Sequence, residues 1–321
     1  MKDDLKKIVI EDFESSCGKK LQNLQLSYQF FGKRLGTAPI ILINHALTGN
    51  SVISGKYGWW SEIVGINRAV DLNKFTVLCI NIPGNGFNEE NFDFSVELNL
   101  GDIAHIFIKA LDKLKISKLY AIIGGSIGGC LTWEMAAIKN DIAEKIIPVA
   151  SDWKANDWVI ANTFLQDRIL ENSKDPIGDA RIHAMKFYRT PESLNHRFSR
   201  SKNIEKGIYN VESWLNHHAI KLNQRFSLNS YKFLNKLLRS ADITRDDTRL
   251  ESKIMRSKSE IHIISVDSDI FFLPDEDRIT TQRLKKQKVK IKNHVIESIH
   301  GHDAFLIETK QISDIFTKIL K

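Results

Sequence analysis

"AIIGGSIGGC", residues 121–130, joins an apolar run to a helix-like run through a turn rich in glycine. Gly124, Ser126 and Gly128 form the pattern G-x-S-x-G within it. The preceding "KLYAIIGG" (118–125) is typical of a buried strand, and "IGGCLTWEMAAIK" (127–139) predicts a helix. A tight strand–turn–helix of this kind raises the serine above the edge of a sheet as a nucleophile. The alternative is a glycine-rich turn with an ordinary capping serine.

Short apolar runs surround this motif from residue 24 to residue 150. Three more of them predict strands: "PIILINHA" (39–46), "FTVLCINIPG" (75–84) and "KIIPVA" (145–150). Near-continuous apolar runs are typical of strands covered on both faces, as in a parallel sheet with crossover helices. The spacing of apolar residues over 100–114 predicts one such helix, and "IVIEDF" with "LQLSYQFFG" predicts an antiparallel hairpin that opens the sheet.

The sequence pattern changes between residues 152 and 255, where apolar residues recur at helical intervals and glycines are few. Strand and helix patterns then return in four segments: 260–269 (strand), 273–287 (helix), 292–299 (strand) and 303–320 (helix). We therefore expect an α/β core formed by residues 1–151 and 256–321. A helical lid domain, residues 152–255, is inserted before the last two strands.

Composition and charge exclude several classes of protein. The chain has 321 residues, of which 42% are hydrophobic and 26% charged, as in soluble globular proteins. The charged start, residues 1–13, lacks the apolar region of a signal peptide, and no stretch predicts a membrane span. The net charge is +7, but only 283–292 is densely basic, which indicates a solvated surface rather than a nucleic-acid site. Three scattered cysteines without metal-ligand spacing favour a reduced, cytoplasmic compartment.

A serine nucleophile needs a base to take its proton and an acid to orient that base. In this class of site the chain order is serine, then an acid, then histidine. Asp269, at the end of the segment 260–269, and His302 are the expected acid and base. Asp267 is the rival acid, and His300 is expected to be structural because it lies closer to the preceding strand.

An oxyanion hole requires two backbone N–H groups. One is expected from Ile127, directly after the nucleophile, and the other from Leu47 in "NHALTGN" (44–50), which follows an earlier strand. His45 in the same loop is expected to pack and form hydrogen bonds rather than to catalyse.

The chain resembles the homoserine O-acetyltransferases of the α/β-hydrolase superfamily. The segments that carry the resemblance follow one another in the family's order: "NHALTGN", "GWWSEIVG" (58–65), "GGSIGG", "GDARIHAMKFYRTPESLNHRFSR" (178–200), "VESWLNHHAIKLNQRFSLNSYKFLNKLL" (211–238) and "GHDAFLIE" (301–308). The similarity covers most of the chain from about residue 24, including the lid. It implies an α/β-hydrolase fold and transfer of an acetyl group from acetyl-CoA to homoserine through an acyl-enzyme, in methionine biosynthesis. No bound cofactor is expected.

The resemblance also implies substrate contacts. Arg181 and Tyr188 match positions that line the family's substrate tunnel, and Arg181 would hold the carboxylate of the amino acid. Asp303 would hold its ammonium group. The alternative for Arg181 is an arginine on the surface of the lid. The alternative for Asp303 is an N-cap of the last helix.

Residues 85–102 depart from the family's pattern, because they are shorter and more acidic. Succinyl-CoA as donor and serine as acceptor therefore remain alternatives. Hydrolysis of an ester or thioester on the same triad is a further alternative, and a non-catalytic binding protein is a third. The resemblance implies a homodimer formed through the lid, with no nucleic acid or membrane as partner.

Overall fold

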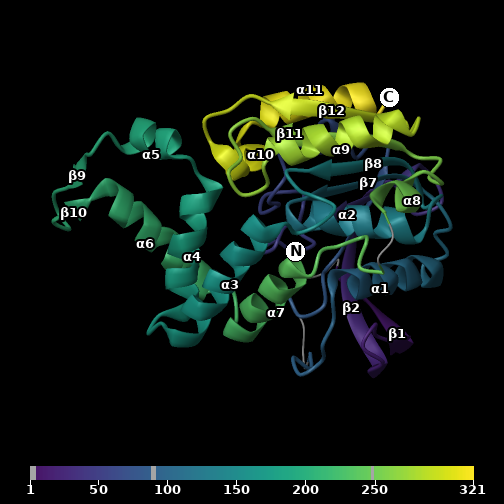
Figure 1. The fold of residues 1–321 in the computed structure, drawn as a ribbon, viewed down its shortest axis with the longest axis horizontal. Coiled ribbons are helices and arrows are strands. Elements are labelled where there is room, and N and C mark those ends of the chain that lie inside the picture. The colour runs from purple at the N-terminus through teal and green to yellow at the C-terminus, as the bar shows by residue number, and fades with distance from the viewer. Residues whose placement is uncertain (1–4, 88–91, 247–248) are drawn as a thin grey trace.

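The centre of the molecule is a sheet of eight strands in the order β1-β2-β6-β3-β7-β8-β11-β12 (Figure 1). The computed structural model describes residues 5–87, 92–246 and 249–321. Within the shortened segment 85–102, residues 88–91 therefore lie outside the described residues. The strands are β1 (Lys6–Glu14), β2 (Lys20–Gly32), β3 (Ile40–Asn44), β6 (Thr76–Ile80), β7 (Leu119–Gly125), β8 (Ala143–Val149), β11 (Glu260–Val266) and β12 (Ile291–Ile296).

Strand direction divides this sheet into two parts. β1 and β2 form the predicted antiparallel hairpin, and β2 also pairs antiparallel with β6. From β6 to β12 every neighbouring pair is parallel. The carboxyl ends of β3, β7, β8, β11 and β12 therefore lie along one edge, where open α/β sheets place their functional groups.

The apolar runs form strands because both faces of the sheet are covered. Side chains alternate between two apolar clusters: Leu42 and Leu78 lie in one, whereas Ile41 and Val77 lie in the other. The first cluster is covered by α1 (Leu100–Lys113), α2 (Ile127–Ile138) and α9 (Pro274–Lys286), and the second by α11 (Thr309–Ile319) together with the loop between β3 and β6. This double cover accounts for the absence of alternation in these strand sequences.

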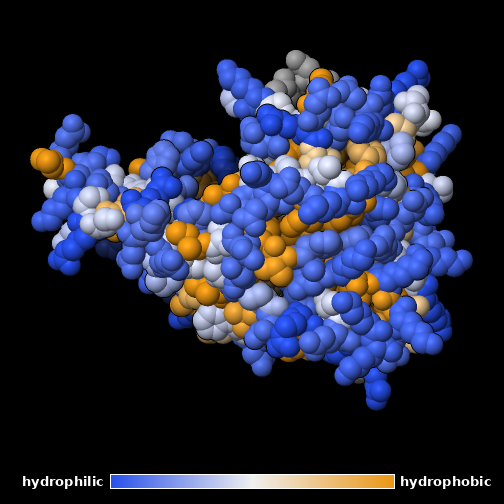
Figure 2. All heavy atoms as spheres, turned by 90° about the horizontal axis from the view of Figure 1, so that it is seen from above, coloured by the Kyte–Doolittle hydropathy of each residue, from blue (hydrophilic) through white to orange (hydrophobic). Residues whose placement is uncertain are grey.

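A helical insertion follows β8 and precedes β11. Its elements are α3 (Asp157–Asn172), α4 (Pro176–Tyr188), α5 (Pro191–Phe198), β9 (Lys202–Asn203), β10 (Ile208–Tyr209), α6 (Asn210–Asn223) and α7 (Leu228–Arg239). A short helix before β11, α8 (Leu250–Ile254), packs against α2 and α9 of the core. α3, α4 and α7 lie against the core, while α5, β9, β10 and part of α6 form an arm that projects from it (Figure 1). Hydrophobic side chains are visible at the end of this arm in Figure 2. The predicted α/β-hydrolase fold with a helical insertion is confirmed.

The end of the chain differs from the single helix predicted over 303–320. It forms three pieces: η1 (Gly301–Asp303), α10 (Ala304–Ile307) and α11. Glu308, with φ −82° and ψ 54°, separates α10 from α11 and so ends the first helix. The prediction was wrong because the apolar spacing continues through a backbone break that spacing does not report. Among the described residues, no helix is long and apolar enough to cross a membrane.

Candidate active site

Ser126 lies on the sharp turn between β7 and α2. Its backbone has φ 57° and ψ −127°, a left-handed conformation that non-glycine residues rarely adopt. The glycines around it are required by close packing: a Cβ on Gly128 would lie 2.2 Å from the carbonyl oxygen of Asn44, and one on Gly124 would lie 2.0 Å from that of Gly128. The sequence therefore produces a strained turn that brings the serine hydroxyl to the carboxyl edge of the sheet.

The three side chains predicted as a triad lie in one chain of hydrogen bonds. His302 Nε2 lies 3.0 Å from Ser126 Oγ, and His302 Nδ1 lies 2.7 Å from Asp269 Oδ2. All three residues are buried. With the proton on Nδ1, the histidine donates to the carboxylate, and Nε2 is left to accept the proton of the serine hydroxyl.

Backbone and aromatic groups fix the orientation of this histidine. The second carboxylate oxygen of Asp269 accepts the N–H groups of Phe271 at 2.7 Å and Phe272 at 3.0 Å, so the acid cannot rotate freely. The rings of Tyr188, Phe271, Phe272 and Phe305 surround the imidazole, with centroids 5.3 to 5.7 Å from it. This apolar enclosure keeps water away from the two hydrogen bonds and strengthens them.

The backbone N–H groups of Ile127, the first residue of α2, and of Leu47, in the loop after β3, have no acceptor within the described part of the chain. These are the groups expected to form the oxyanion hole.

Hydrogen bonds within the core and one from the insertion hold the loop that carries Leu47. His45 Nε2 accepts the N–H of Ile82 at 3.0 Å, and its Nδ1–H donates to the carbonyl of Ala46 at 2.8 Å. Burial lowers the pKa of His45 to about 4, so its ring is neutral near pH 7. From the insertion, Arg225 Nη1 donates to the carbonyl of Thr48 at 2.7 Å.

The substrate residues expected from the lid lie on α4, beside the histidine. The Tyr188 ring packs 5.3 Å from the His302 ring, and the guanidinium of Arg181 lies 5.7 Å from the centroid of Tyr188. Burial raises the pKa of the Tyr188 phenol, which therefore remains neutral near pH 7. Arg181 is thus half-buried beside Tyr188.

Asp303 follows His302 directly. It precedes α10 but makes no capping hydrogen bond to that helix. Instead, its carboxylate lies 3.9 Å from Arg189 Nη1. Burial raises the pKa of the Asp303 carboxyl, and the guanidinium of Arg181 opposes the rise. The carboxylate is therefore directed toward a cationic environment rather than toward the backbone of the last helices.

Asp267, the rival acid, and His300, expected to be structural, make hydrogen bonds outside the triad. Asp267 is exposed and accepts the N–H of Ser298 at 2.9 Å. His300 Nδ1 lies 2.9 Å from Ser193 Oγ and 3.1 Å from Arg189 Nη2, so it joins the insertion to the core.

Arg189 and Arg225 make contacts near the site that the sequence did not reveal. Arg189 is 5% exposed and reaches both His300 and Asp303. Its position directly after Tyr188 was the available signal, but nothing in the pattern separates it from the other arginines of the segment.

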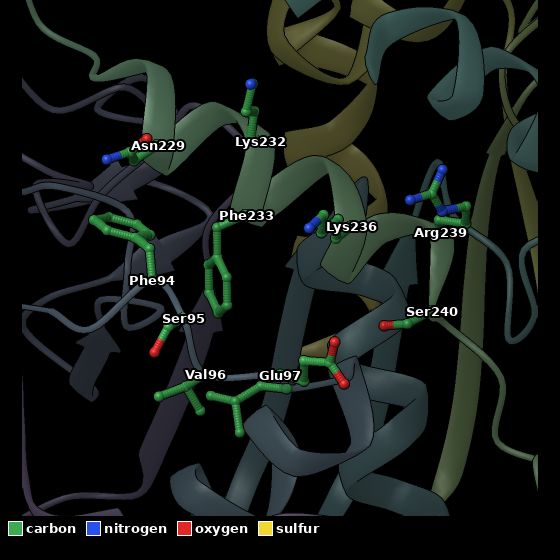
Figure 3. A pocket seen from close by; sticks show the side chains of 11 residues that line it. Phe94, Ser95, Val96, Glu97, Asn229, Lys232, Phe233, Lys236, Arg239 and Ser240 are labelled. Atoms are coloured by element: carbon green, nitrogen blue, oxygen red, sulfur yellow. The ribbon is translucent and has the colours of Figure 1, made fainter. Parts of the chain in front are cut away.

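Two of the cavities near the insertion concern the candidate site. A basic cavity of about 470 Å³ lies between the insertion and the turn around η1, and its lining includes Arg181 and Asp303. A second, of about 620 Å³, lies between α7 and residues 94–98 (Figure 3). Lys232 and Lys236 line the second cavity beside Phe94, but the triad residues do not.

Comparison with known proteins places this geometry in a family. The family model described as "alpha/beta hydrolase fold" matches residues 39–308. The homoserine O-acetyltransferase of Methanococcus vannielii is 30% identical over 345 residues, which cover 94% of this chain and 70% of that protein. The chain belongs to the homoserine O-acetyltransferase family of α/β-hydrolases. It is an enzyme of that family, as the resemblance predicted.

Solved structures share the fold. The homoserine O-acetyltransferase from Bacillus anthracis superposes with a TM-score of 0.86 at 18% identity, covering 99% of this chain and 97% of that one. An acetylester hydrolase from Corynebacterium glutamicum gives a TM-score of 0.82 at 20% identity, with coverage of 98% and 95%. At these identities the likeness shows the fold alone. Members of this fold include both transferases and hydrolases, so the acceptor must be inferred from the site.

Proposed function

We propose that the protein transfers an acyl group, acetyl in the first place, from acyl-CoA to the hydroxyl of homoserine, in the cytoplasm. The observation that carries this proposal is the placement of Arg181 and Asp303 beside the His302–Ser126 pair. A guanidinium and a carboxylate on one side of a nucleophile match the two charges of an amino acid. Hydrolysis uses water as the acceptor and so gives no role to a site for an amino acid.

The mechanism follows from the hydrogen bonds of the triad. Ser126 Oγ attacks the thioester carbonyl while His302 Nε2 takes the hydroxyl proton, and Asp269 stabilises the imidazolium. The N–H groups of Leu47 and Ile127 donate to the oxygen that becomes negative. The thiol of CoA then leaves with the proton from His302, and Ser126 carries the acyl group as an ester.

The second half-reaction reverses these roles. His302 takes the proton of the acceptor hydroxyl, which attacks the acyl-enzyme, and then returns a proton to Ser126 Oγ as the product ester leaves. Arg181 would hold the acceptor's carboxylate and Asp303 its ammonium group, with Tyr188 forming the wall between Arg181 and the histidine. Water competes with the acceptor for the acyl-enzyme, so tight binding of the amino acid determines whether transfer or hydrolysis prevails.

The test is an acyl-transfer assay with acetyl-CoA and succinyl-CoA against homoserine, serine and water. We expect O-acetylhomoserine as the main product. Release of free acetate at an equal rate with and without an amino acid contradicts the proposal and assigns the chain to the hydrolases. Ser126→Ala is the matched control, because it should abolish both the transfer and the acyl adduct seen by intact mass.

Substitution of Arg181 tests the acceptor site separately. Arg181→Ala removes a charge-assisted contact worth about 1.5–3 kcal/mol, so the KM for homoserine should rise roughly tenfold to a hundredfold. An unchanged KM for the amino acid would return Arg181 to the role of a surface arginine.

We also propose that the insertion carries the contact surface of a homodimer. α3 exposes Trp158, Phe164 and Leu165, and α6 exposes Ile220. α3 and α6 both pack against α4, and exposed apolar side chains of this size on the insertion favour burial against a second copy. Light scattering on the purified protein tests this: a dimer is expected, and Phe164→Glu should shift it toward monomer. A wild-type monomer at micromolar concentration contradicts the assignment.

A further inference from the structure

The basic cavity lies at the boundary between the insertion and the core. α4, α5 and α6 contribute Arg181, Arg197 and Trp214 to its lining, and the turn at η1 contributes Asp303. Arg189, directly after α4, completes the basic wall. Elements that are far apart in the sequence therefore meet around a space of about 470 Å³.

The charges of this wall do not balance. Among the described lining residues, Asp303 alone carries a carboxylate, and this carboxylate lies 3.9 Å from Arg189 Nη1. Within the described part of the chain, Arg189 is the lining arginine in an ion pair, and Arg181 acts on Asp303 only at longer range. The nearby His218 adds no charge, because burial and the guanidinium of Arg181 lower its pKa to about 4. A surplus of two positive charges remains, and an anionic ligand would offset it.

The arginines are also held in place. Arg189 and Arg197 lie over the ring of Trp214, at 5.8 and 5.5 Å from its centroid. Arg189 is buried and also donates to Ser193 Oγ, at 2.8 Å from Nη2. The ring of Trp214 positions both guanidinium groups, and the hydrogen bonds to Ser193 restrain Arg189 further, which reduces the entropy lost when they bind an oxyanion. Guanidinium groups positioned in this way are suited to phosphate oxygens.

Part of the cavity lining is apolar. Leu306 and Ile307 of α10 line it and are partly exposed. The site therefore combines a doubly positive wall with an aliphatic rim, and it borders the triad through Asp303. A ligand that carries several phosphate oxygens on an uncharged flexible arm fits both parts.

We propose that Arg189 and Arg197, held on Trp214, bind the phosphate groups of the thioester donor during acylation of Ser126. This assignment rests on the proposed acyltransfer and identifies where the donor's nucleotide end lies. Donor and acceptor occupy the site in turn, so Arg181 is available to the amino acid after CoA has left.

The test compares two donors that differ in their phosphates: acetyl-CoA and S-acetyl-N-acetylcysteamine. Arg197 is exposed, so Arg197→Ala should fold. We expect the ratio of kcat/KM for acetyl-CoA to that for the phosphate-free thioester to fall about tenfold, through the KM for acetyl-CoA. Arg197→Lys should recover part of that ratio. Raising the ionic strength should weaken acetyl-CoA use by wild type more than by Arg197→Ala.

Two control variants remove a cation elsewhere. Arg200→Ala removes an exposed guanidinium that lies 5.6 Å from the ring of Tyr209, outside the cavity. Lys236→Ala removes a cation from the cavity of Figure 3. Both should keep the wild-type ratio. If Lys236→Ala lowers the ratio and Arg197→Ala does not, the phosphates bind in that other cavity and the proposal is wrong.

Further outcomes also contradict the proposal. If Arg197→Ala lowers kcat/KM equally for both thioesters, Arg197 acts on the part that the two donors share or on the fold. If only the KM for homoserine rises, Arg197 belongs to the acceptor site. If wild type transfers no acyl group from acetyl-CoA, the proposed function fails, and calorimetry with adenosine 3′,5′-bisphosphate then decides the phosphate site. Binding that Arg197→Ala weakens about tenfold supports the site, whereas no binding to wild type refutes it.

Discussion

Replacement of Asp269 by asparagine tests the orientation of the catalytic histidine with little change in shape. In the wild type, one carboxylate oxygen accepts the Nδ1–H of His302 at 2.7 Å, and the other accepts two backbone N–H groups, those of Phe271 and Phe272. The amide oxygen of asparagine can keep the two backbone bonds. Its NH₂ group must then face His302 Nδ1.

This exchange reverses the polarity of the critical hydrogen bond. Because the amide donates, Nδ1 must accept, and the imidazole proton moves to Nε2, which lies 3.0 Å from Ser126 Oγ. A protonated Nε2 cannot take the serine proton. In a serine protease the same change lowers kcat by about 10⁴-fold, which corresponds to about 5.5 kcal/mol of activation free energy, and we expect a loss of that order here.

Acyl transfer from acetyl-CoA and the burst of p-nitrophenol from p-nitrophenyl acetate both measure this loss. The melting temperature should change little, because the backbone contacts persist. Asp267→Asn is the matched control: Asp267 is exposed and accepts the N–H of Ser298, so its kcat should stay within about twofold of wild type. A loss of less than tenfold in Asp269→Asn refutes the assignment, and a large loss in Asp267→Asn would transfer the acid's role to that residue.

Three further changes test the packing, electrostatics and insertion contacts. Gly128→Ala places a methyl group 2.2 Å from the Asn44 carbonyl oxygen, so it should lower the free energy of unfolding by about 3 kcal/mol or more in chemical denaturation; an unchanged midpoint contradicts the close packing. Burial raises the pKa of Asp152 from 3.8 to about 7, so the folded state binds the extra proton, and the contribution of this carboxyl to stability declines as pH rises from 4 to 7. Asp152→Asn should remove up to about 4 kcal/mol of decline from the pH profile of stability; parallel pH profiles for both proteins would exclude it. Arg225→Gln removes the hydrogen bond from Arg225 to the Thr48 carbonyl, so kcat with acetyl-CoA or S-acetyl-N-acetylcysteamine should fall by up to about tenfold at unchanged melting temperature. Full activity of this variant shows that the loop of Leu47 needs no support from the insertion.

The sequence predicted what depends on local order along the chain. Ser126 was identifiable because G-x-S-x-G lay between a strand and a helix, and the fold followed from uninterrupted apolar runs. Asp269 and His302 were selected by chain order, and the structure brings both to Ser126. Their roles in catalysis remain predictions until the variants are measured.

What the sequence did not reveal depends on contacts between distant elements. Arg189 meets Asp303 and Trp214 only because α4, α6 and the turn after β12 converge. Nothing in the sequence around Arg189 distinguishes it from the other arginines of the insertion. The break at Glu308 was missed for a similar reason, because a single backbone torsion interrupts an apolar spacing that otherwise continues.

The insertion and the core contribute different things to the site. Ser126, Asp269 and His302 all belong to the core, whereas three arginines of the basic cavity and Trp214 come from the insertion. The catalytic groups are therefore encoded outside the stretch of the gene that encodes most of the proposed ligand-binding groups, and Asp303 is the core's own contribution to binding. Evolution can replace one stretch while keeping the other, and a protein engineer can exchange the insertion between relatives to redirect acyl transfer without redesigning the nucleophile.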